Sequence, residues 1–193
     1  MDRELLLTGI GGQGIQLAAQ VLARAALLDG RSVQMFGSYG GMMRGGRTDA
    51  TIVVADAAVE APPTVHDAWA AIFMHHEYAA PILAAVRSGG LVLVSSDVRG
   101  APIEPERYTV LDIEAAEMAE RAGNRMGASM VMLGTLSAAT ELVSVDSLAA
   151  AVADSLPPYR KQLAEVNVAA IRAGFDAAPR GVAPAWETQA VAG

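Results

Sequence analysis

The stretch ELLLTGIGGQGIQLAAQVL, residues 4–22, decides the fold of this chain. Its first five residues are mainly apolar and predict a short buried strand, and the residues after Gly14 repeat apolar side chains at helical spacing. Between them, Gly9, Gly11 and Gly14 satisfy the pattern G-x-G-x-x-G. A strand that runs through such a glycine turn into a helix predicts a Rossmann-like start to an α/β domain.

Strand-like and helical patterns alternate along the rest of the chain. The runs that predict further strands lie at residues 32–36, 48–55, 69–74, 91–96 and 108–113. The runs that predict further helices lie at residues 75–90, 114–123, 129–142, 145–156 and 159–177. This alternation predicts a three-layer α/β/α domain with a mostly parallel sheet over residues 1–177. Residues 178–193 show little periodicity and are predicted to be a C-terminal tail, in which Trp186 either docks on another surface or folds back.

The composition is that of a well-filled globular domain, with 52% hydrophobic and 18% charged residues among 193. No cysteine is present, which excludes disulfides, thiolate zinc sites and cysteine-ligated iron–sulfur clusters within this chain. The net charge of −7 argues against nucleic-acid binding, which needs a surplus of Lys and Arg. No apolar run approaches the roughly 18 residues of a spanning helix. The first residues do not resemble a signal peptide, so we expect a cytoplasmic protein with no membrane partner.

The glycine motif is a candidate contact for an anionic or polar ligand. Glycines let the turn bend tightly, and the helix that follows presents unpaired backbone N–H groups to a phosphate or carboxylate. NAD binding is not favoured, because residues 34–38 contain no acid at the end of the second strand to hold the ribose. The alternative is that the glycines only let the strand and the helix pack closely. The candidate cofactor-binding residues are Gly9, Gly11, Gly12, Gln13 and Gly14.

A second glycine-rich segment, FGSYGGMMRGGRTDA at residues 36–50, follows the second predicted strand. It offers hydroxyl groups, a forked guanidinium suited to phosphate or carboxylate, and glycines that allow close backbone approach. Its predicted position, at the carboxyl end of a strand, is where open α/β sheets bind ligands. The alternative is a surface loop whose arginines are solvated. The candidate cofactor-binding residues in this segment are Ser38, Tyr39, Gly40, Arg44, Gly45 and Gly46.

Four segments, in this order along the chain, carry a resemblance to a known family. They are GIGGQGI at residues 9–15, SYG-x-x-x-RGG at 38–46, MVMLGTLSAAT at 130–140 and NVAAIRAGFDA at 167–177. Together they resemble the gamma subunit, or gamma domain, of the 2-oxoacid:ferredoxin oxidoreductases, which include pyruvate, 2-oxoglutarate, 2-oxoisovalerate and indolepyruvate types. The resemblance spans roughly residues 3–177, so residues 1–177 are expected to form a gamma-type catalytic domain.

The resemblance implies a multisubunit enzyme that oxidatively decarboxylates a 2-oxoacid to acyl-CoA and CO2 and passes the electrons to ferredoxin or a similar acceptor. In this family, thiamine diphosphate lies between alpha and beta subunits, and 4Fe-4S clusters are held by cysteine-bearing subunits, with a ferredoxin-like subunit as a further partner. The gamma chain holds no cofactor alone. It is expected to complete the assembly and to shape the coenzyme A side of the site, where Arg44 and the neighbouring glycines would contact coenzyme A phosphates or partner subunits.

Two departures from the family pattern leave the 2-oxoacid substrate open. Residues 41–43 are GMM where the family often has a proline and an acid, and residues 74–77 are MHHE where it often reads Met-Asn-Gln. His75 and His76 are adjacent, so their side chains diverge on a helix or a strand and predict no metal site. No catalytic residue is assigned. The remaining alternatives are a free-standing nucleotide- or flavin-binding α/β oxidoreductase and a purely structural subunit.

Overall fold

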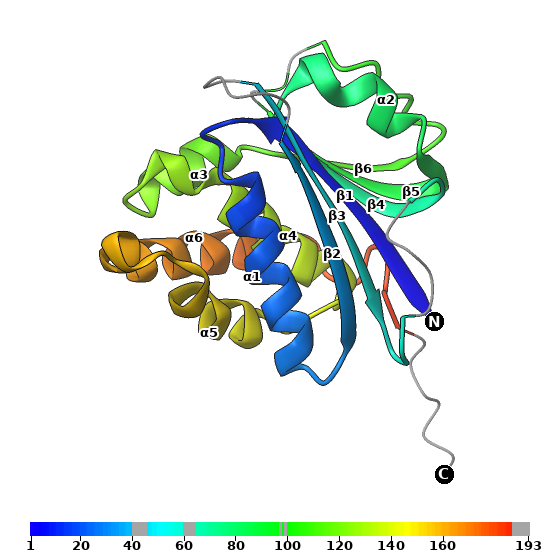
Figure 1. Cartoon of the computed structure of the whole chain (residues 1–193). Helices are drawn as coiled ribbons and strands as arrows, with labels where there is room; N and C mark the ends of the chain where they lie inside the picture. Colours follow the sequence, from blue (N-terminus) through cyan, green and yellow to red (C-terminus); the bar gives the residue numbers. More distant parts are fainter. Residues whose placement is uncertain (40–45, 60–64, 97, 99, 187–193) are drawn as a thin grey trace.

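The computed structural model describes residues 1–39, 46–59, 65–96, 98 and 100–186. Its strands are β1 (Asp2–Ile10), β2 (Ser32–Tyr39), β3 (Arg47–Ala55), β4 (Ala68–Phe73), β5 (Val86–Ser95) and β6 (Thr109–Ile113). They form one six-stranded sheet in the order β2-β3-β1-β4-β5-β6 (Figure 1). The longer helices are α1 (Ile15–Leu28), α4 (Ala128–Thr140), α5 (Val145–Ser155) and α6 (Ala164–Ala177). The shorter ones are α2 (Ala79–Leu83) and α3 (Ala115–Arg121), with 3-10 turns η1 (His76–Tyr78), η2 (Arg125–Gly127) and η3 (Pro158–Leu163).

The sheet is mostly parallel, as predicted, and β3 is the strand that runs against the others. β3 pairs antiparallel with both β1 and β2, whereas the pairs β1–β4, β4–β5 and β5–β6 are parallel. The connection between β2 and β3 explains this direction, because it comprises only residues 40–46. Parallel neighbours need a crossover of roughly a dozen residues or more, whereas a short loop suffices for a hairpin. β3 therefore separates β2 from β1 in an otherwise Rossmann-like start.

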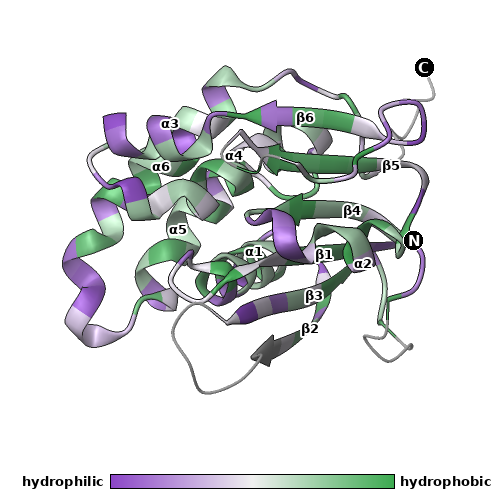
Figure 2. Ribbon diagram, turned by 90° about the horizontal axis from the view of Figure 1, so that it is seen from above, coloured by the Kyte–Doolittle hydropathy of each residue, from purple (hydrophilic) through white to green (hydrophobic). Residues whose placement is uncertain are grey.

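The sheet is covered on both faces, which gives three layers of unequal thickness. Alternate residues of β1 point to opposite faces, so that Leu5 and Leu7 join the larger core while Leu6 joins the smaller one. The larger core packs under α1, α3, α4, α5 and α6, and the smaller one under α2 (Figure 1). Figure 2 shows that β4 and β5 are hydrophobic along most of their length, as expected of strands that are buried on both faces.

The helix predicted over residues 75–90 is wrong in its extent. Only η1 and the five-residue α2 are helical there, and β5 already begins at Val86. Gly89 and Gly90, taken as a helix end, lie inside β5, and Gly89 has a positive φ of 75°. A Cβ on Gly90 would lie 3.2 Å from the Trp69 carbonyl oxygen of the neighbouring strand. The glycines are therefore needed for an irregularity in the β4–β5 pairing, where the register shifts.

Helix α4 is buried along its whole length and packs most extensively against α6. Two glycines bring the backbones of these helices together. A Cβ on Gly134 would lie 1.9 Å from the carbonyl oxygen of Ile171, and a Cβ on Gly174 would lie 2.0 Å from that of Val131. Because both obstacles are backbone atoms, neither can move aside without separating the helices.

Residues 178–186, the first part of the predicted tail, pack across the end of α4. The backbone N–H groups of Gly181, Ala183 and Ala185 donate to the last carbonyl groups of that helix, at 3.1, 3.0 and 2.7 Å. The Trp186 indole N–H donates to the Leu142 carbonyl at 3.1 Å, and the Arg31 guanidinium lies 3.9 Å from its ring centroid. Trp186 thus folds back on its own chain, while the domain boundary at residue 177 stays a prediction.

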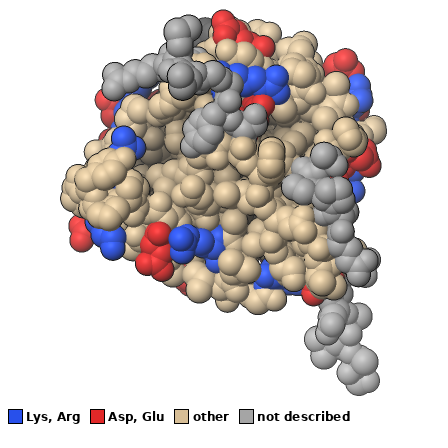
Figure 3. Space-filling view, viewed as in Figure 1, with Lys and Arg blue, Asp and Glu red and all other residues tan. Residues whose placement is uncertain are grey.

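The surface carries no concentrated basic region on the face drawn in Figure 3. Acidic and basic side chains are scattered there, singly or in small mixed groups, around a large uncharged area. Within the part of the chain that the structure describes, no helix is long and apolar enough to cross a membrane. Both glycine segments were predicted to lie at the carboxyl edge of the sheet, which is where open α/β sheets bind ligands.

We predict that Gly134→Ala and Gly174→Ala each lower the free energy of unfolding by about 2 kcal/mol or more, because the new methyl group must push two helix backbones apart. The steric cost should outweigh the roughly 1 kcal/mol by which alanine is otherwise more favourable than glycine in a helix. Urea unfolding would measure it. Ala169→Ser on the exposed side of α6 is the matched control, with a change within about 0.5 kcal/mol. Equal stability of the glycine variants and the control would contradict the close packing.

Candidate functional site

The first glycine segment connects β1 to α1 at the carboxyl edge of the sheet. Gly12 and Gly14 have positive φ values of 109° and 77°, a backbone conformation that favours glycine. Gly14 is the N-cap of α1, so no side chain caps this helix, and its first turn contains no acidic residue. Among the described residues, no acceptor pairs with the backbone N–H of Gly12 or Gly14. The helix therefore presents open donors and the positive end of its dipole, as an anion-binding terminus would.

Gln13 uses both ends of its side-chain amide inside the protein. Its Oε1 accepts from the Ile10 backbone N–H at 2.9 Å, and its Nε2 donates to the Met74 carbonyl at 2.7 Å. A Cβ on Gly9 would lie 2.5 Å from the same Oε1. Gln13 thus joins the ends of the neighbouring strands β1 and β4, and the glycine at position 9 leaves room for its side chain. These contacts give the predicted site residues Gly9 and Gln13 a supporting role in holding the loop.

The second glycine segment meets the first at the same edge of the sheet. The antiparallel register pairs Ile10 with Arg47, and the Gly11 backbone N–H donates to the Gly46 carbonyl at 2.9 Å. Ser38 and Tyr39 form the end of β2, next to β3. The remaining predicted site residues of this segment, Gly40, Arg44 and Gly45, lie outside the described residues. The structure therefore brings Gly46 beside Gly11, and the ligand contacts of the whole segment stay a prediction.

Asp49 organises the base of the second segment, a role that the sequence did not reveal. Its carboxylate accepts from the Thr8 hydroxyl at 2.6 Å and from the Arg47 Nε at 2.6 Å, and its carbonyl accepts from the Gln16 amide at 2.7 Å. The Arg47 guanidinium also lies 5.8 Å from the Tyr78 ring centroid. Asp49 thus ties β3 to β1 and α1, and Arg47, one of the two arginines in residues 36–50, is paired with it.

A pocket of about 330 Å³ opens beside the first glycine segment. Gly12 and Gly14 form one side, and its other walls come from α1, η2, α4, η3 and α6. Two buried polar residues line it, Ser129 and Asn167, which are only 3% and 4% exposed. Arg160 is the single charged residue among those that line the described pocket. Ser129, Asn167 and Arg160 were not predicted as site residues, because a serine and an asparagine in apolar helical runs give no signal in the sequence.

A smaller pocket of about 170 Å³ lies on the other side of the same loop. Its lining includes Gln13 of the glycine segment, Met74 and Ser95 at the ends of β4 and β5, and Arg125. Arg125 is paired with Glu120 at 3.4 Å. Met126 lines both pockets and is 63% exposed, so its side chain forms the ridge between them. The carboxyl edge therefore has two hollows, of which the larger one holds the open helix terminus.

The carboxylates with perturbed pKa values lie at the other end of β1. Burial, with Asp67 and Asp2 nearby, raises the pKa of Glu4, and a hydrogen bond from the Met1 ammonium lowers the pKa of Asp56. At the carboxyl edge, His75 caps η1 by accepting from the Glu77 backbone N–H. Its ring stacks on His76 with centroids 4.8 Å apart, so the expectation that these adjacent side chains diverge is wrong, because His75 has an extended backbone and His76 begins a turn. No cluster of three metal-ligating side chains occurs among the residues that the structure describes. The unpaired donors at this edge are the backbone N–H groups of Gly12 and Gly14, which are suited to binding a ligand.

We predict that Gln13→Glu lowers the free energy of unfolding by about 1–3 kcal/mol, because a carboxylate oxygen would replace the amide that donates to the Met74 carbonyl. Gln13→Ala should cost less, since it leaves two unpaired backbone groups but adds no charge. Chemical denaturation would measure both. Gln20→Glu, at an exposed position of the same helix, is the control and should change stability by less than about 0.5 kcal/mol. A Gln13→Glu protein as stable as this control would contradict the clamp, that is, the two hydrogen bonds by which Gln13 joins β1 to β4.

Known proteins resemble this chain over nearly its whole length. Residues 4–177 match the family described as pyruvate ferredoxin/flavodoxin oxidoreductase. The 2-oxoglutarate synthase subunit KorC of Methanocaldococcus jannaschii is 33% identical over 181 residues, which cover 92% of this chain and 95% of KorC. The pyruvate synthase subunit PorC of Methanothermobacter thermautotrophicus is 28% identical, over 90% of this chain and 94% of PorC.

A solved structure agrees with these sequence relatives. The gamma subunit of a keto/oxoacid ferredoxin oxidoreductase from Geobacter sulfurreducens matches the fold with a TM-score of 0.76 at 28% identity, over 91% of this chain and 95% of that one. The family predicted from the four sequence segments and the fold class predicted from the alternation of strands and helices are thereby confirmed. The chain belongs to the pyruvate ferredoxin/flavodoxin oxidoreductase family, as a homologue of its gamma subunits.

Proposed function

We propose that this chain is the gamma subunit of a cytoplasmic, multisubunit 2-oxoacid oxidoreductase that converts a 2-oxoacid and coenzyme A to acyl-CoA and CO2 and passes electrons to ferredoxin or a similar acceptor. The family match and the gamma-subunit relatives support this function, and they do not support a free-standing nucleotide- or flavin-binding enzyme. The chain has no cysteine with which to hold an iron–sulfur cluster. Clusters would therefore belong to cysteine-bearing partners, and the family relationship implies that thiamine diphosphate lies between the alpha and beta subunits.

The role of this chain within the complex is to form one wall of the coenzyme A site and to complete the assembly. The observation that carries this role is the open N-terminus of α1 between two glycine segments at one sheet edge. Phosphate groups bind well to such a terminus, and coenzyme A carries several. The donors there can hold and orient a ligand, while the decarboxylation chemistry is supplied by thiamine diphosphate on the partner subunits.

The relatives favour 2-oxoglutarate as the substrate of the complex. The 2-oxoglutarate synthase subunits from three methanogens are 32–34% identical to this chain, and the pyruvate synthase subunits from two of them are 26–28% identical. The assay of the purified complex should therefore compare 2-oxoglutarate with pyruvate. We expect Phe36, which lies on the edge strand β2 and is 63% exposed, to contact a partner subunit.

We predict that Arg44→Ala, in the complex co-expressed and purified with its partner subunits, raises the KM for coenzyme A by about tenfold at unchanged kcat. Loss of one charge-assisted hydrogen bond of about 1.5 kcal/mol has this effect. Steady-state rates at saturating 2-oxoacid would measure it. Arg24→Ala, at an exposed position of α1, is the control and should leave both constants unchanged. An Arg44→Ala complex with the KM of wild type would show that Arg44 does not contact coenzyme A.

The assembly itself is tested by size-exclusion chromatography of the co-expressed subunits. We expect this chain to elute with thiamine-diphosphate-binding and cysteine-bearing partners, and the combined fractions to form acyl-CoA. A chain that eluted alone and bound NAD or a flavin tightly would contradict the proposed function.

A further inference from the structure

We propose that the 330 Å³ pocket beside the first glycine segment is a phosphate-binding subsite formed by Ser129, Asn167, Arg160 and the N-terminus of α1. The proposal extends the proposed function, because in the assembled enzyme this phosphate would belong to coenzyme A. It assigns ligand contacts to residues outside the two glycine motifs, on α4, η3 and α6.

Two buried polar side chains without partners point to a ligand. Ser129 and Asn167 are only 3% and 4% exposed, yet neither side chain makes a hydrogen bond with any of the described residues. Every fully buried side-chain nitrogen or oxygen among the described residues does have a partner. The hydroxyl of Ser129 and the amide of Asn167 therefore keep a small opening, and both line the pocket. Both polar groups are therefore accessible from the pocket, where a bound ligand would pair with them.

The open end of α1 lies directly against one of these groups. A Cβ on Gly14 would lie 2.8 Å from the Ser129 Oγ, so only a glycine lets the helix terminus and the hydroxyl approach this closely. The backbone N–H groups of Gly12 and Gly14 have no acceptor among the described residues. A single group in the pocket can thus receive donors from the loop backbone and from Ser129 together, which is the arrangement that phosphate oxygens require.

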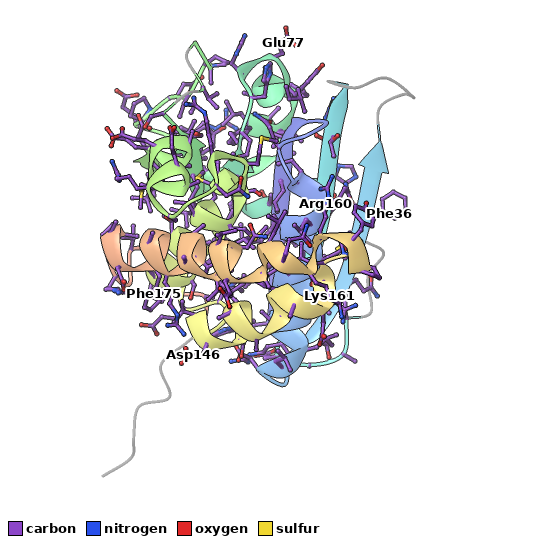
Figure 4. The ribbon with its side chains drawn as sticks, turned by 90° about the vertical axis from the view of Figure 1, so that its left-hand side faces the viewer. Phe36, Glu77, Asp146, Arg160, Lys161 and Phe175 are labelled. Carbon is purple, nitrogen blue, oxygen red and sulfur yellow. The ribbon has the colours of Figure 1, made fainter. Side chains whose placement is uncertain are left out.

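The charge of the pocket favours an anion. Arg160 is its one charged lining residue in the described structure, and no carboxylate there pairs with this guanidinium. Arg160 lies on η3, with its guanidinium 5.6 Å from the Tyr159 ring centroid. Figure 4 shows Arg160 and its neighbour Lys161 on different sides of this turn, and Lys161 does not line the pocket. In a chain of net charge −7, a cation without an acidic partner beside an open helix terminus selects negatively charged ligands.

The shape of the pocket agrees with a phosphate that belongs to a larger molecule. Its volume exceeds what a single phosphate fills, and part of its lining is apolar, from Leu17, Met130, Leu156 and Leu163. A ligand pocket of this kind combines an apolar wall with a few convergent polar groups. The smaller pocket is a poorer candidate, since its arginine, Arg125, is already paired with Glu120.

The test uses the assembled complex, with coenzyme A and dephospho-coenzyme A as alternative acyl acceptors. We expect Arg160→Gln to raise the KM for coenzyme A about tenfold and Ser129→Ala about threefold, with kcat unchanged. Asn167→Asp should raise it more than tenfold, because a carboxylate would repel the phosphate. Lys161→Gln is the matched control and should change the KM less than twofold. Thermal unfolding of each variant would confirm that the fold is retained.

The two acceptors identify which phosphate occupies the pocket. If the variants weaken coenzyme A but not dephospho-coenzyme A, the ribose 3′-phosphate is the occupant, and if they weaken both equally, the diphosphate is. A coenzyme A KM that is unchanged in Arg160→Gln, Ser129→Ala and Asn167→Asp would overturn the proposal and leave the proposed function intact.

Direct binding of inorganic phosphate tests the pocket independently of the proposed function. Calorimetry with inorganic phosphate on the purified protein would show millimolar or tighter binding that Arg160→Gln weakens and Lys161→Gln does not. This result would support the pocket even if no acyl-CoA were formed. If no acyl-CoA is formed and no KM can be measured, absence of phosphate binding that depends on Arg160 would refute the proposal.

Discussion

The complete burial of α4 is the constraint on which the rest of this structure depends. The first turn of α4 places Ser129 against Gly14, so that it defines the pocket beside the glycine loop. Its middle, at Gly134, fits against the backbone of α6, the helix that also carries Asn167. Its last carbonyl groups accept hydrogen bonds from residues 178–186. A shift of this one helix would therefore move two walls of the pocket and loosen the core together.

The antiparallel strand β3 has the second organising role, because it converts two distant glycine segments into one edge. Nine residue pairs hold β3 to β1, and the last of them brings Arg47 beside Ile10. The Thr8–Asp49–Arg47 contacts and the Gln13 clamp then hold the strand ends on both sides of the loop. The polar groups around the loop therefore have two different roles. Gln13, Gln16 and Asp49 form hydrogen bonds that support the backbone, whereas the backbone N–H groups of Gly12 and Gly14 are available to a ligand.

Much of this fold follows from local sequence patterns, because strand and helix periodicity depend on neighbours along the chain. The six strands, the long helices and the glycine turn between β1 and α1 were all predictable in this way. The antiparallel direction of β3 was not predicted, since it depends on the hairpin with β2. The start of β5 at Val86 was not predicted either, since it depends on pairing with β4. The site was predictable only at its glycines. Ser129 and Asn167 become recognisable when three dimensions show that they are buried, unpaired and adjacent to one pocket.

The acidic charge of the chain and a phosphate site are compatible for a simple physical reason. Most donors in the larger pocket are neutral, namely backbone N–H groups, one hydroxyl and one amide, and Arg160 adds a single positive charge. Fixed neutral dipoles stabilise an anion at short range without creating a long-range positive potential. Such a site does not attract polyanions such as nucleic acids to the surface, yet it can hold one phosphate that reaches the helix terminus. The cationic segment at residues 36–50 is then an addition to a binding edge whose main donors carry no charge at all.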